Sequence, residues 1–280
     1  MAMRIVSWLL CAILVVRLRL RKTILVQTVH NRQTHESGSW PERVLVNHLT
    51  SLVASRVYMV DDPMMSANDR MIPHGHYEDW YSVHERSEAK PGALAFAGII
   101  RPYKGVLELI RAFRSIPDAV SLSVCGRTID EDYRAQVIEE ASSDPRVHLK
   151  LEHVDDAELV SIITRAQLVV LPYRDVYNSG ALLLALSLGR PVLVRDSATV
   201  RQLAGEVGDR WVRTFTGDLT TDDLLEALQA ASPTLTGKPD LSARNWETIG
   251  AAHAALYRAL SAHARTRTQR TKPSRDRRDK

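Results

Sequence analysis

"QLVVLPYRDVYNSGALLLALSLGRPVLVR", residues 167–195, decides the fold class of this chain. Two aliphatic runs of strand length, 167–173 and 191–195, stand on either side of a helical segment. Continuous rather than alternating apolar character is typical of strands that are buried on both faces of a sheet. A polar turn, Asn178-Ser179-Gly180, leads into the helical segment, and Gly189-Arg190-Pro191 ends it. The stretch therefore predicts a strand, a buried helix and a second strand in succession.

The same alternation extends outward along the chain. Further aliphatic runs of strand length lie at 23–29, 56–60, 93–98, 120–126 and 146–151, and most are separated by helical patterns. Strands that alternate with helices predict a parallel sheet covered by helices on both faces. From Pro91 to about Ala231 the alternation is regular enough for one complete Rossmann-like domain. Residues 1–80 offer only two or three strands, which predicts a truncated N-terminal α/β domain.

These observations divide the chain into four parts. We expect a partial N-terminal α/β domain over residues 1–83 and a polar linker with a Pro-Gly pair over 84–92. A Rossmann-like domain over 93–262 and a disordered basic tail over 263–280 follow. A last helix is expected at 243–260, with an apolar face made of Trp246, Ile249, Ala252 and Leu256.

The charge of the chain is concentrated at its C-terminus. The formal net charge is +4, yet residues 264–280 alone hold eight Lys and Arg against two Asp. We favour a solvated tail, with contact to anionic lipid or nucleic acid as the alternative. No aromatic platform accompanies the charge, so a nucleic-acid partner is not expected. Cys11 and Cys125 lack metal-ligand spacing and are interpreted as small core residues in a reducing compartment.

The first apolar run is too short to cross a bilayer. It extends from Ile5 to Val16, about a dozen residues where about 20 are needed. No small-residue cleavage site precedes the basic "RLRLRK" that follows, which argues against a signal peptide. Two interpretations remain. The favoured one is a helix packed on a sheet, and the other is a helix in a membrane interface with its arginines at the headgroups.

Two turns that follow predicted strands carry cations. In "FAGIIRPYKGV", residues 96–106, Arg101 and Lys104 precede a helix that Gly105 opens, and this pattern suits a clamp for a diphosphate. In "SVCGRTIDED", residues 123–132, Gly126 permits close approach to the backbone and Arg127 adds a third cation. The alternatives are solvated surface for the first turn and, with equal weight, a helix start capped by Thr128 or Asp130 for the second.

The third turn is the one at Asn178-Ser179-Gly180. Asn178 or Ser179 can cap the helix, and Gly180 removes side-chain bulk at its first position. A helix N-terminus carries about half a positive charge, which suits a phosphate, although simple capping is the alternative. Because the carboxyl ends of parallel strands meet at one edge of a sheet, the three turns converge. That convergence favours a ligand site.

A second group of polar residues lies in the N-terminal half. "TVHNRQTHE", residues 28–36, follows a predicted strand, and "MIPHGHYEDWY" covers 71–81. Together they supply His30, Asn31, His35, Glu36, His74 and His76. No helical His-x3-His spacing is present, so a histidine acting as general base or as a hydrogen-bond donor to a sugar or phosphate is favoured over a metal site.

These residues resemble a known family. "FAGIIRPYKGVLELIRAF", "LSVCG", "LVVLPY" and the Gly-Arg-Pro-Val after a small-residue helix resemble the C-terminal domain of GT-B-fold glycosyltransferases that use nucleotide-diphosphate sugars. The resemblance covers about 91–260 and includes a Trp-bearing helix that crosses back to the N-terminal domain in that fold. "TVHN" and "IPHGHYEDWY" resemble the last part of that N-terminal domain.

The resemblance implies a role for each matching residue. Arg101 and Lys104 would hold the donor diphosphate, together with backbone N–H groups of Asn178, Ser179 and Gly180. Gly126 and Arg127 would line the nucleotide pocket, with Tyr173 near the base or ribose. His30 would face the cleft as the candidate catalytic base, with His35 or Glu36 as substitutes in that role. The remaining acceptor-side candidates would be Asn31, His74 and His76.

One departure affects the mechanism. Retaining members of the group have two glutamates separated by seven residues around the third turn, and here the corresponding positions are Val176 and Leu184. The stretch is therefore similar to a divergent branch that includes exopolysaccharide mannosyltransferases. The resemblance leaves open whether the anomeric configuration is retained or inverted.

Together these features predict an enzyme. We expect transfer of a hexose, such as mannose from GDP-mannose, to a saccharide or lipid-linked acceptor in polysaccharide or glycoconjugate synthesis. We recognise no Asp-x-Asp metal motif and expect neither a metal nor another cofactor besides the donor. We expect a cytoplasmic protein in peripheral contact with the inner face of the cell membrane. The alternative is a non-catalytic GT-B remnant that serves as a binding partner or scaffold.

Overall fold

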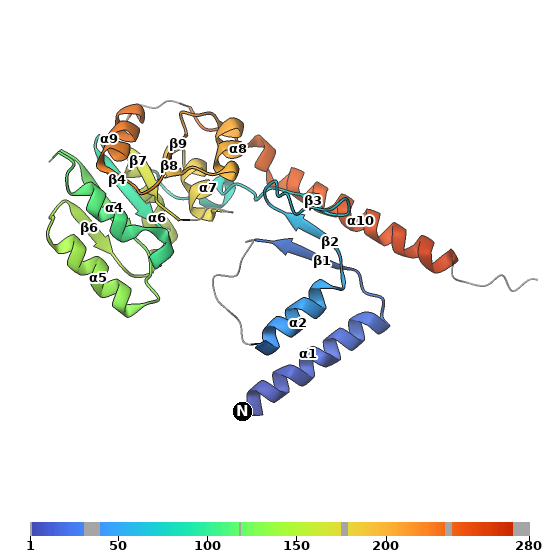
Figure 1. The fold of residues 1–280 in the computed structure, drawn as a ribbon. Helices are drawn as coiled ribbons and strands as arrows, with labels where there is room; N and C mark the ends of the chain where they lie inside the picture. The colour runs from blue at the N-terminus through green and yellow to red at the C-terminus, as the bar shows by residue number, and fades with distance from the viewer. Residues whose placement is uncertain (1, 31–39, 118, 175–178, 233–236, 271–280) are drawn as a thin grey trace, which may run out of the picture. The chain divides into compact units, whose positions relative to one another are not determined.

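The computed structural model describes residues 2–30, 40–117, 119–174, 179–232 and 237–270, which form two compact units (Figure 1). Unit 1 combines Met1–His74 with Trp246–Lys280, and unit 2 is Gly75–Asn245. The chain thus passes between the units twice, at residues 74–75 and at residues 245–246. Each unit has its own sheet and its own core.

Unit 2 is built on a six-stranded parallel sheet. Its strands are β4 (Ala93–Ala97), β5 (Ser121–Cys125), β6 (Val147–Lys150), β7 (Leu168–Leu171), β8 (Val192–Arg195) and β9 (Val212–Phe215). They lie in the order β6-β5-β4-β7-β8-β9, and every neighbouring pair is parallel. The order reverses between β4 and β7, so their carboxyl ends form the switch point where ligands of such sheets bind. The predicted α/β class is confirmed.

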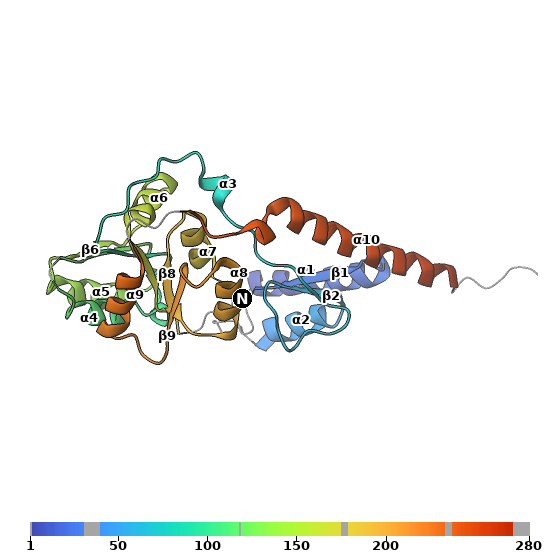
Figure 2. The ribbon, with the colours of Figure 1, turned by 90° about the horizontal axis from the view of Figure 1, so that it is seen from above.

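Helices cover both faces of this sheet (Figures 1 and 2). One face carries α4 (Val106–Phe113), α5 (Glu131–Ser142) and α9 (Thr221–Ala230), and the other carries α6 (Asp156–Arg165), α7 (Gly180–Ser187) and α8 (Ala198–Val207). A side chain caps the start of five of them by accepting a backbone N–H, as short polar residues do at helix starts: Asp130, Asp155, Ser179, Ser197 and Thr220. Three short elements complete the unit: α3 (Glu78–Tyr81), η1 (Pro102–Lys104) and η2 (Ser242–Arg244).

Unit 1 has a smaller, three-stranded parallel sheet. It consists of β1 (Leu25–Val29), β2 (Val53–Tyr58) and β3 (Arg70–Met71), with the helices α1 (Ala2–Leu20), α2 (Trp40–Thr50) and α10 (Trp246–Arg270). Ile249 and Leu256 of α10 are buried with Val57 and Ile72 in the core of this unit. The apolar face expected for the last helix is therefore real, although Trp246 at its start is half exposed.

The unit boundaries differ from those that the composition predicts. Residues 84–92, the expected linker, pack on unit 2, where Ser87 N–H donates to Thr164 Oγ1 at 2.9 Å and Lys90 N–H donates to the Arg165 carbonyl. Helix α10 belongs to unit 1 rather than to the domain expected over 93–262. It also continues to Arg270, through part of the stretch expected to be a disordered tail.

Strand β9 has no counterpart among the predicted strands. It lies at the edge of the sheet and includes Arg213 and Thr214, which are partly or fully exposed between buried Val212 and Phe215. An edge strand has only one neighbour, and it tolerates polar residues that a strand buried on both faces does not. A search for continuous aliphatic runs therefore misses it.

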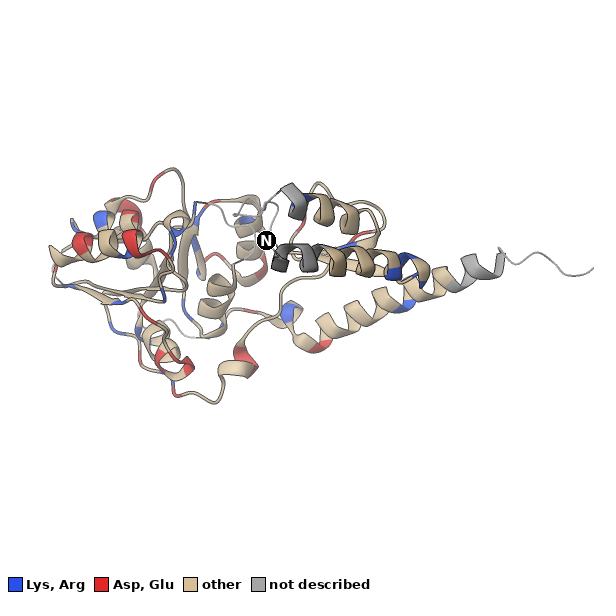
Figure 3. Ribbon diagram, turned by 90° about the horizontal axis from the view of Figure 1, so that it is seen from below, with Lys and Arg blue, Asp and Glu red and all other residues tan. Residues whose placement is uncertain are grey.

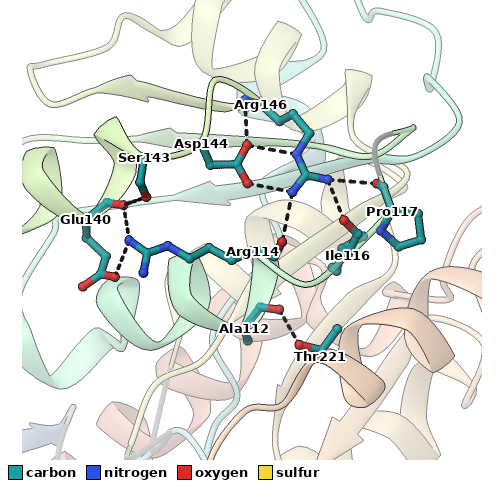
Figure 4. A network of polar contacts seen from close by, with 9 residues as sticks. All are labelled: Ala112, Arg114, Ile116, Pro117, Glu140, Ser143, Asp144, Arg146 and Thr221. Atoms are coloured by element: carbon teal, nitrogen blue, oxygen red, sulfur yellow. Dashed lines mark hydrogen bonds and ion pairs between the residues drawn. The ribbon is translucent and has the colours of Figure 1, made fainter.

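At the opposite edge of the sheet from the switch point, one arginine holds several segments together (Figure 4). Arg146, just before β6, makes paired hydrogen bonds to Asp144 at 2.9 and 2.7 Å. It also donates to the carbonyl oxygens of Arg114, Ile116 and Pro117, which follow α4. A charged group thus binds carbonyls of the C-cap residue of α4 and of the turn that follows the helix.

Candidate functional site

The site is built around two glycines that end adjacent strands. Gly98 follows β4 and Gly126 follows β5, with φ of +141° and +138°, a region that side chains disfavour. A Cβ on Gly126 would lie 2.0 Å from the Gly98 carbonyl oxygen, so no larger residue fits there. The two backbones meet without side chains between them, which opens the carboxyl edge of the sheet.

The turn after β4 is held against the end of β7. Gly105, at φ +70°, joins η1 to α4, and a Cβ there would lie 2.5 Å from the Pro172 carbonyl oxygen. Arg174 N–H donates to the Tyr103 carbonyl at 3.0 Å. These contacts fix Lys104, the last residue of η1, beside the residues that follow β7.

Lys104 lies in a poor environment for a lone cation. Its Nζ is 4.7 Å from the centre of the Tyr173 ring and 3.5 Å from the Tyr173 hydroxyl. Burial, with the nearby Arg101 guanidinium as a second cause, lowers the pKa of Lys104 to about 8. A partly desolvated ammonium next to another cation gains most from a bound anion. The arrangement thus has the electrostatics of an anion site.

Tyr173 belongs to the packed wall of this site. It is 5% exposed, and its ring meets Phe96 edge to face with the centroids 6.2 Å apart. Its hydroxyl faces Lys104, and burial raises its pKa, with the Ser179 side chain as a smaller opposing influence. The described contacts of Tyr173 are therefore with the cationic turn, residues 101–104, and with the start of α7. The resemblance instead implies a place near the nucleobase or ribose of the donor.

The first turn of α7 completes the edge. Ser179 Oγ accepts a hydrogen bond from Leu182 N–H at 3.2 Å, as predicted for a cap, while Asn178 lies outside the described residues. The position of a Cβ on Gly98 would be 3.5 Å from Lys104 Nζ and 3.9 Å from Ala181 Cβ. The lysine and the helix N-terminus thus border the space that Gly98 leaves empty. Beyond this first turn, Leu182, Leu183 and Leu186 are buried core residues, as expected.

Other candidates at this edge are sorted by their contacts. Arg101 is half-buried beside Lys104, whereas Arg127 is exposed and its carbonyl accepts Ile100 N–H at 2.9 Å. Asp130, not Thr128, caps α5, since its Oδ1 accepts Tyr133 N–H at 3.0 Å. Thr128 is buried, and its hydroxyl has no hydrogen-bond partner among the described residues.

One interpretation of the sequence needs correction. Asp130-Glu131-Asp132 has Asp-x-Asp spacing, so the expectation that the sequence lacks this motif is wrong. Asp130 is committed to capping α5, and Glu131 and Asp132 are exposed in the first turn of that helix. Over the part of the chain that the structure describes, no three His, Cys, Asp or Glu side chains are grouped as metal ligands would be.

The N-terminal candidates are divided between the units. His30 is exposed directly after β1, and the His74 ring meets the Trp246 ring edge to face at 6.2 Å, both within unit 1. His76 belongs to unit 2, where it is buried and its Nδ1 accepts Glu78 N–H at 3.2 Å. That contact gives His76 a part in holding the turn before α3. Asn31, His35 and Glu36 lie outside the described residues.

One residue beside the site has no signal in the sequence. The hydroxyl of Tyr77 is 3.1 Å from the position of a Cβ on Gly180, the first residue of α7. Tyr77 comes from the stretch that the sequence assigns to the end of the N-terminal domain, but it belongs to unit 2. Only the fold brings these two residues together.

None of the helices within the described ranges combines the length and the apolar character that a membrane span requires. Helix α1 is nonetheless apolar on several sides. Cys11, Val15 and Leu18 are its less exposed positions, while the large apolar side chains that remain exposed are Leu9, Leu10, Ile13, Leu14, Val16 and Leu20.

Comparison with known proteins agrees with this geometry. A relative, the GDP-mannose:glycolipid 4-beta-D-mannosyltransferase of Xanthomonas campestris pv. campestris, is 36% identical over 249 residues, which are 88% of this chain and 71% of that protein. The fold resembles Anabaena HepE in complex with UDP and glucose, with a TM-score of 0.68, 16% identity, and coverage of 90% of this chain and 75% of that one.

It also resembles sucrose-phosphate synthase of Thermosynechococcus elongatus, with a TM-score of 0.62, 17% identity, and coverage of 91% and 72%. At such low identity these two likenesses concern the fold alone. Residues 91–231, which contain the cationic turn, both glycines and α7, match the family described as glycosyl transferases group 1. With its GT-B-like fold and this match, the chain belongs to the group 1 glycosyltransferases.

Proposed function

We propose that this enzyme transfers mannose from GDP-mannose to a lipid-linked saccharide. The observation that carries the donor class is the partly desolvated Lys104 next to the first turn of α7, because both favour a diphosphate leaving group. The choice of mannose, of guanine as the nucleobase and of a lipid-linked acceptor is based on the relative that is 36% identical and is named for those substrates.

We propose further that the anomeric carbon is inverted. The mannose of GDP-mannose is α-linked, so transfer into a β linkage, as the relative's name specifies, requires attack from the opposite face. The acceptor oxygen forms a bond to the anomeric carbon while the bond to the phosphate oxygen breaks and its electron pair leaves with GDP. The acceptor proton passes to a base, for which His30 after β1 is our candidate.

Positively charged groups of the protein would neutralise the negative charge that develops on the leaving diphosphate. Lys104 and Arg101 lie near each other in the turn that follows β4, and the N–H groups at the start of α7 add positive potential. We therefore propose transfer without a metal cofactor. Activity that survives EDTA supports this part of the proposal, and activity that returns only on adding Mg²⁺ or Mn²⁺ contradicts it.

Peripheral membrane contact through α1 is also proposed. Its exposed apolar side chains are followed by Arg17, Arg19, Arg21 and Lys22, and the helix contains no acidic residue; Figure 3 shows the described part of α1 without red and with blue at its C-terminal end. Apolar side chains that insert below the headgroups, together with basic residues, fit an anionic lipid surface. Such a surface is also where a lipid-linked acceptor resides.

The membrane proposal is tested by sedimentation with vesicles. Ile13→Glu should reduce binding to phosphatidylglycerol vesicles, while Val83→Glu, at an exposed valine of unit 2, should leave it unchanged. Equal binding of both variants, or wild-type protein that remains in the supernatant, overturns the proposal. A wild-type dimer that Ile13→Glu dissociates assigns this face to a second copy instead.

The transfer proposal is tested with the full chain, GDP-mannose and a lipid-linked oligosaccharide fraction. GDP release and labelled lipid should appear, and Lys104→Met should weaken GDP binding by about tenfold or more, whereas Lys90→Met, at an exposed lysine of the same unit, should not. GDP binding without transfer supports the alternative of a non-catalytic remnant. Absence of binding to any nucleoside diphosphate overturns the donor assignment.

A further inference from the structure

Tyr77 contacts helix α7 near both of its ends. Its backbone N–H donates to Ser187 Oγ at 2.9 Å at the end of the helix. At the start of the helix, its hydroxyl lies 3.1 Å from the position that a Cβ on Gly180 would take. Ser187 is seven positions after Gly180, about 10 Å along a helix axis. Ser187 is fully buried, and its hydroxyl also donates to the Leu183 carbonyl at 2.7 Å. The backbone of Tyr77 is therefore held in place by a hydrogen bond to a buried side chain.

The neighbours of Tyr77 restrict it further. His76 N–H donates to the Arg244 carbonyl at 3.0 Å, and His76 Nδ1 accepts the N–H of Glu78. The Tyr81 ring packs edge to face against the Tyr77 ring with the centroids 6.3 Å apart. Backbone and ring are thus both held, and the hydroxyl position follows from them.

The Tyr77 hydroxyl lies beside the first turn of α7. Lys104 also lies near this turn, but on the side of Ala181 rather than of Gly180. Tyr77 faces Gly180, whereas Lys104 Nζ and Ala181 Cβ border the space at Gly98. Consecutive residues of a helix point about 100° apart, so the two groups approach the turn from different directions. The first N–H groups of a helix have no intrahelical acceptor, and they complete the set of donors.

We propose that Tyr77 is a donor-binding residue whose hydroxyl donates a hydrogen bond to the diphosphate held at the start of α7. This inference rests on the proposed function, since it assumes a nucleoside diphosphate at that turn. Burial raises the pKa of Tyr77, so the hydroxyl keeps its proton at neutral pH and is a donor. The absent side chain of Gly180 leaves room for the hydroxyl, which a Cβ would crowd at 3.1 Å.

The test compares Tyr77→Phe with Tyr81→Phe in the full chain. Tyr81 is a matched control because it is a partly buried tyrosine of the same segment that packs against Tyr77. Calorimetry is run with GDP, UDP and the corresponding nucleosides. Tyr77→Phe should lower the affinity for whichever of GDP and UDP binds more tightly by about tenfold, the usual effect of losing a hydrogen bond to a charged group. Nucleoside affinity and the melting temperature should change no more than in Tyr81→Phe.

The possible results separate the two proposals. If wild-type protein binds neither diphosphate, the proposed function fails. If wild-type protein binds one and Tyr77→Phe binds it equally well, only the assignment of Tyr77 fails. An equal loss for nucleoside and diphosphate also contradicts it, because the hydroxyl would then act on the whole site rather than on the phosphates.

A second variant keeps the question answerable if Tyr77→Phe is poorly folded. Gly180→Ala adds a methyl group whose carbon would lie 3.1 Å from the Tyr77 hydroxyl, so the hydroxyl must shift slightly from its position, while alanine is favourable in a helix. It should weaken diphosphate binding without lowering the melting temperature. In a Tyr77→Phe background the same change should reduce affinity less, because the hydroxyl that it would shift is already absent. Equal costs in both backgrounds contradict the assignment.

Discussion

The Nζ atom of Lys104 lies 4.7 Å from the centre of the Tyr173 ring, and the Tyr173 hydroxyl is 3.5 Å from the same nitrogen. The lysine ends η1 after strand β4, and the tyrosine follows strand β7, so the pair joins the two strands at which the sheet order reverses. Attraction between an ammonium and an aromatic face offsets only part of the cost of burying the charge. The site therefore has a cation that is held in place before its anion arrives.

Binding of GDP should depend on the charge of Lys104. In the free protein its pKa is about 8, and a bound diphosphate favours the ammonium and raises that pKa. Affinity should be constant below about pH 7 to 8 and should fall above it, because a proton must then be taken up on binding. Calorimetry from pH 6.5 to pH 10 checks this. Lys104→Arg should remove the fall, since arginine stays charged.

The same lowered pKa has a defined effect on stability. In the unfolded chain Lys104 binds its proton up to about pH 10.5, so between about pH 8 and that value the unfolded state holds more protons than the native state. The contribution of this group to the free energy of unfolding should therefore rise with pH in that window. Wild-type protein that gains no stability relative to Lys104→Met over that range, or a pH-independent affinity for GDP, contradicts the assignment.

Gly126 should be the least replaceable glycine of the site. Alanine there would place Cβ 2.0 Å from the Gly98 carbonyl oxygen at a φ of +138°. We expect Gly126→Ala to lower the free energy of unfolding by about 3 kcal/mol. Gly205, inside α8 with open space around it, is the control, and its change to alanine should stabilise by about 0.5–1 kcal/mol. Urea denaturation compares the two, and similar effects would mean that the strands do not meet as described.

The sequence predicts the parts of this site that depend on topology. Lys104, Gly126 and Ser179 each follow a buried strand, and parallel strands bring those positions to one edge whatever the side chains are. It does not predict where Tyr173 points, because that depends on packing against Phe96. It also misses Tyr77, since no periodic pattern links that residue to a helix that starts about a hundred positions later.

Polar edge strands and buried histidines are missed for a similar reason. Strand β9 carries Arg213 and Thr214 and lacks the continuous apolar run of its neighbours. His76 belongs to a sequence cluster that suggests chemistry, yet its ring nitrogen accepts the Glu78 N–H inside the fold. A side chain's partner depends on tertiary contacts, which residue spacing alone does not encode.

Arg146 should matter for stability and not for donor binding. It holds Asp144 and three carbonyl oxygens at the edge of the sheet opposite the site (Figure 4). Arg146→Met would remove the guanidinium donor from those groups and leave the Asp144 carboxylate without its ion-pair partner, and we expect a loss of about 3 kcal/mol. Arg111→Met is the control, because its ion pair with Glu140 is exposed on the arginine side and should contribute less than about 1 kcal/mol.

The Arg146 contribution should also depend on pH. The guanidinium of Arg146 is the main cause of the lowered pKa of Asp144. A carboxyl with a lowered native pKa stabilises above its unfolded pKa and loses that contribution as the pH falls through the native value. The difference in stability between wild-type protein and Arg146→Met should therefore shrink below about pH 4. A difference that stays constant from pH 7 to pH 2.5 excludes this origin.

Two buried threonines should respond in opposite ways to the loss of a hydroxyl. Thr164 Oγ1 donates to the Val160 carbonyl at 2.7 Å and accepts Ser87 N–H at 2.9 Å, whereas Thr128 Oγ1 has no partner among the described residues. Valine has the same shape as threonine. Thr164→Val should therefore cost about 1–3 kcal/mol, because it leaves the partly buried Ser87 N–H without its acceptor. Thr128→Val should be neutral or stabilising by up to about 1 kcal/mol, because it removes a buried hydroxyl that makes no hydrogen bond.

Denaturation of both variants with and without GDP separates a structural from a functional hydroxyl at Thr128. The residue follows Gly126 and Arg127 at the carboxyl edge of β5, where a bound nucleotide would lie under the proposed function. If ligand-free Thr128→Val is at least as stable as wild-type protein but gains less stability from saturating GDP, the hydroxyl serves the bound ligand. If GDP stabilises both proteins equally, the Thr128 hydroxyl does not contribute to ligand binding. A loss above about 1 kcal/mol without ligand would show that the hydroxyl does have a hydrogen-bond partner in the fold.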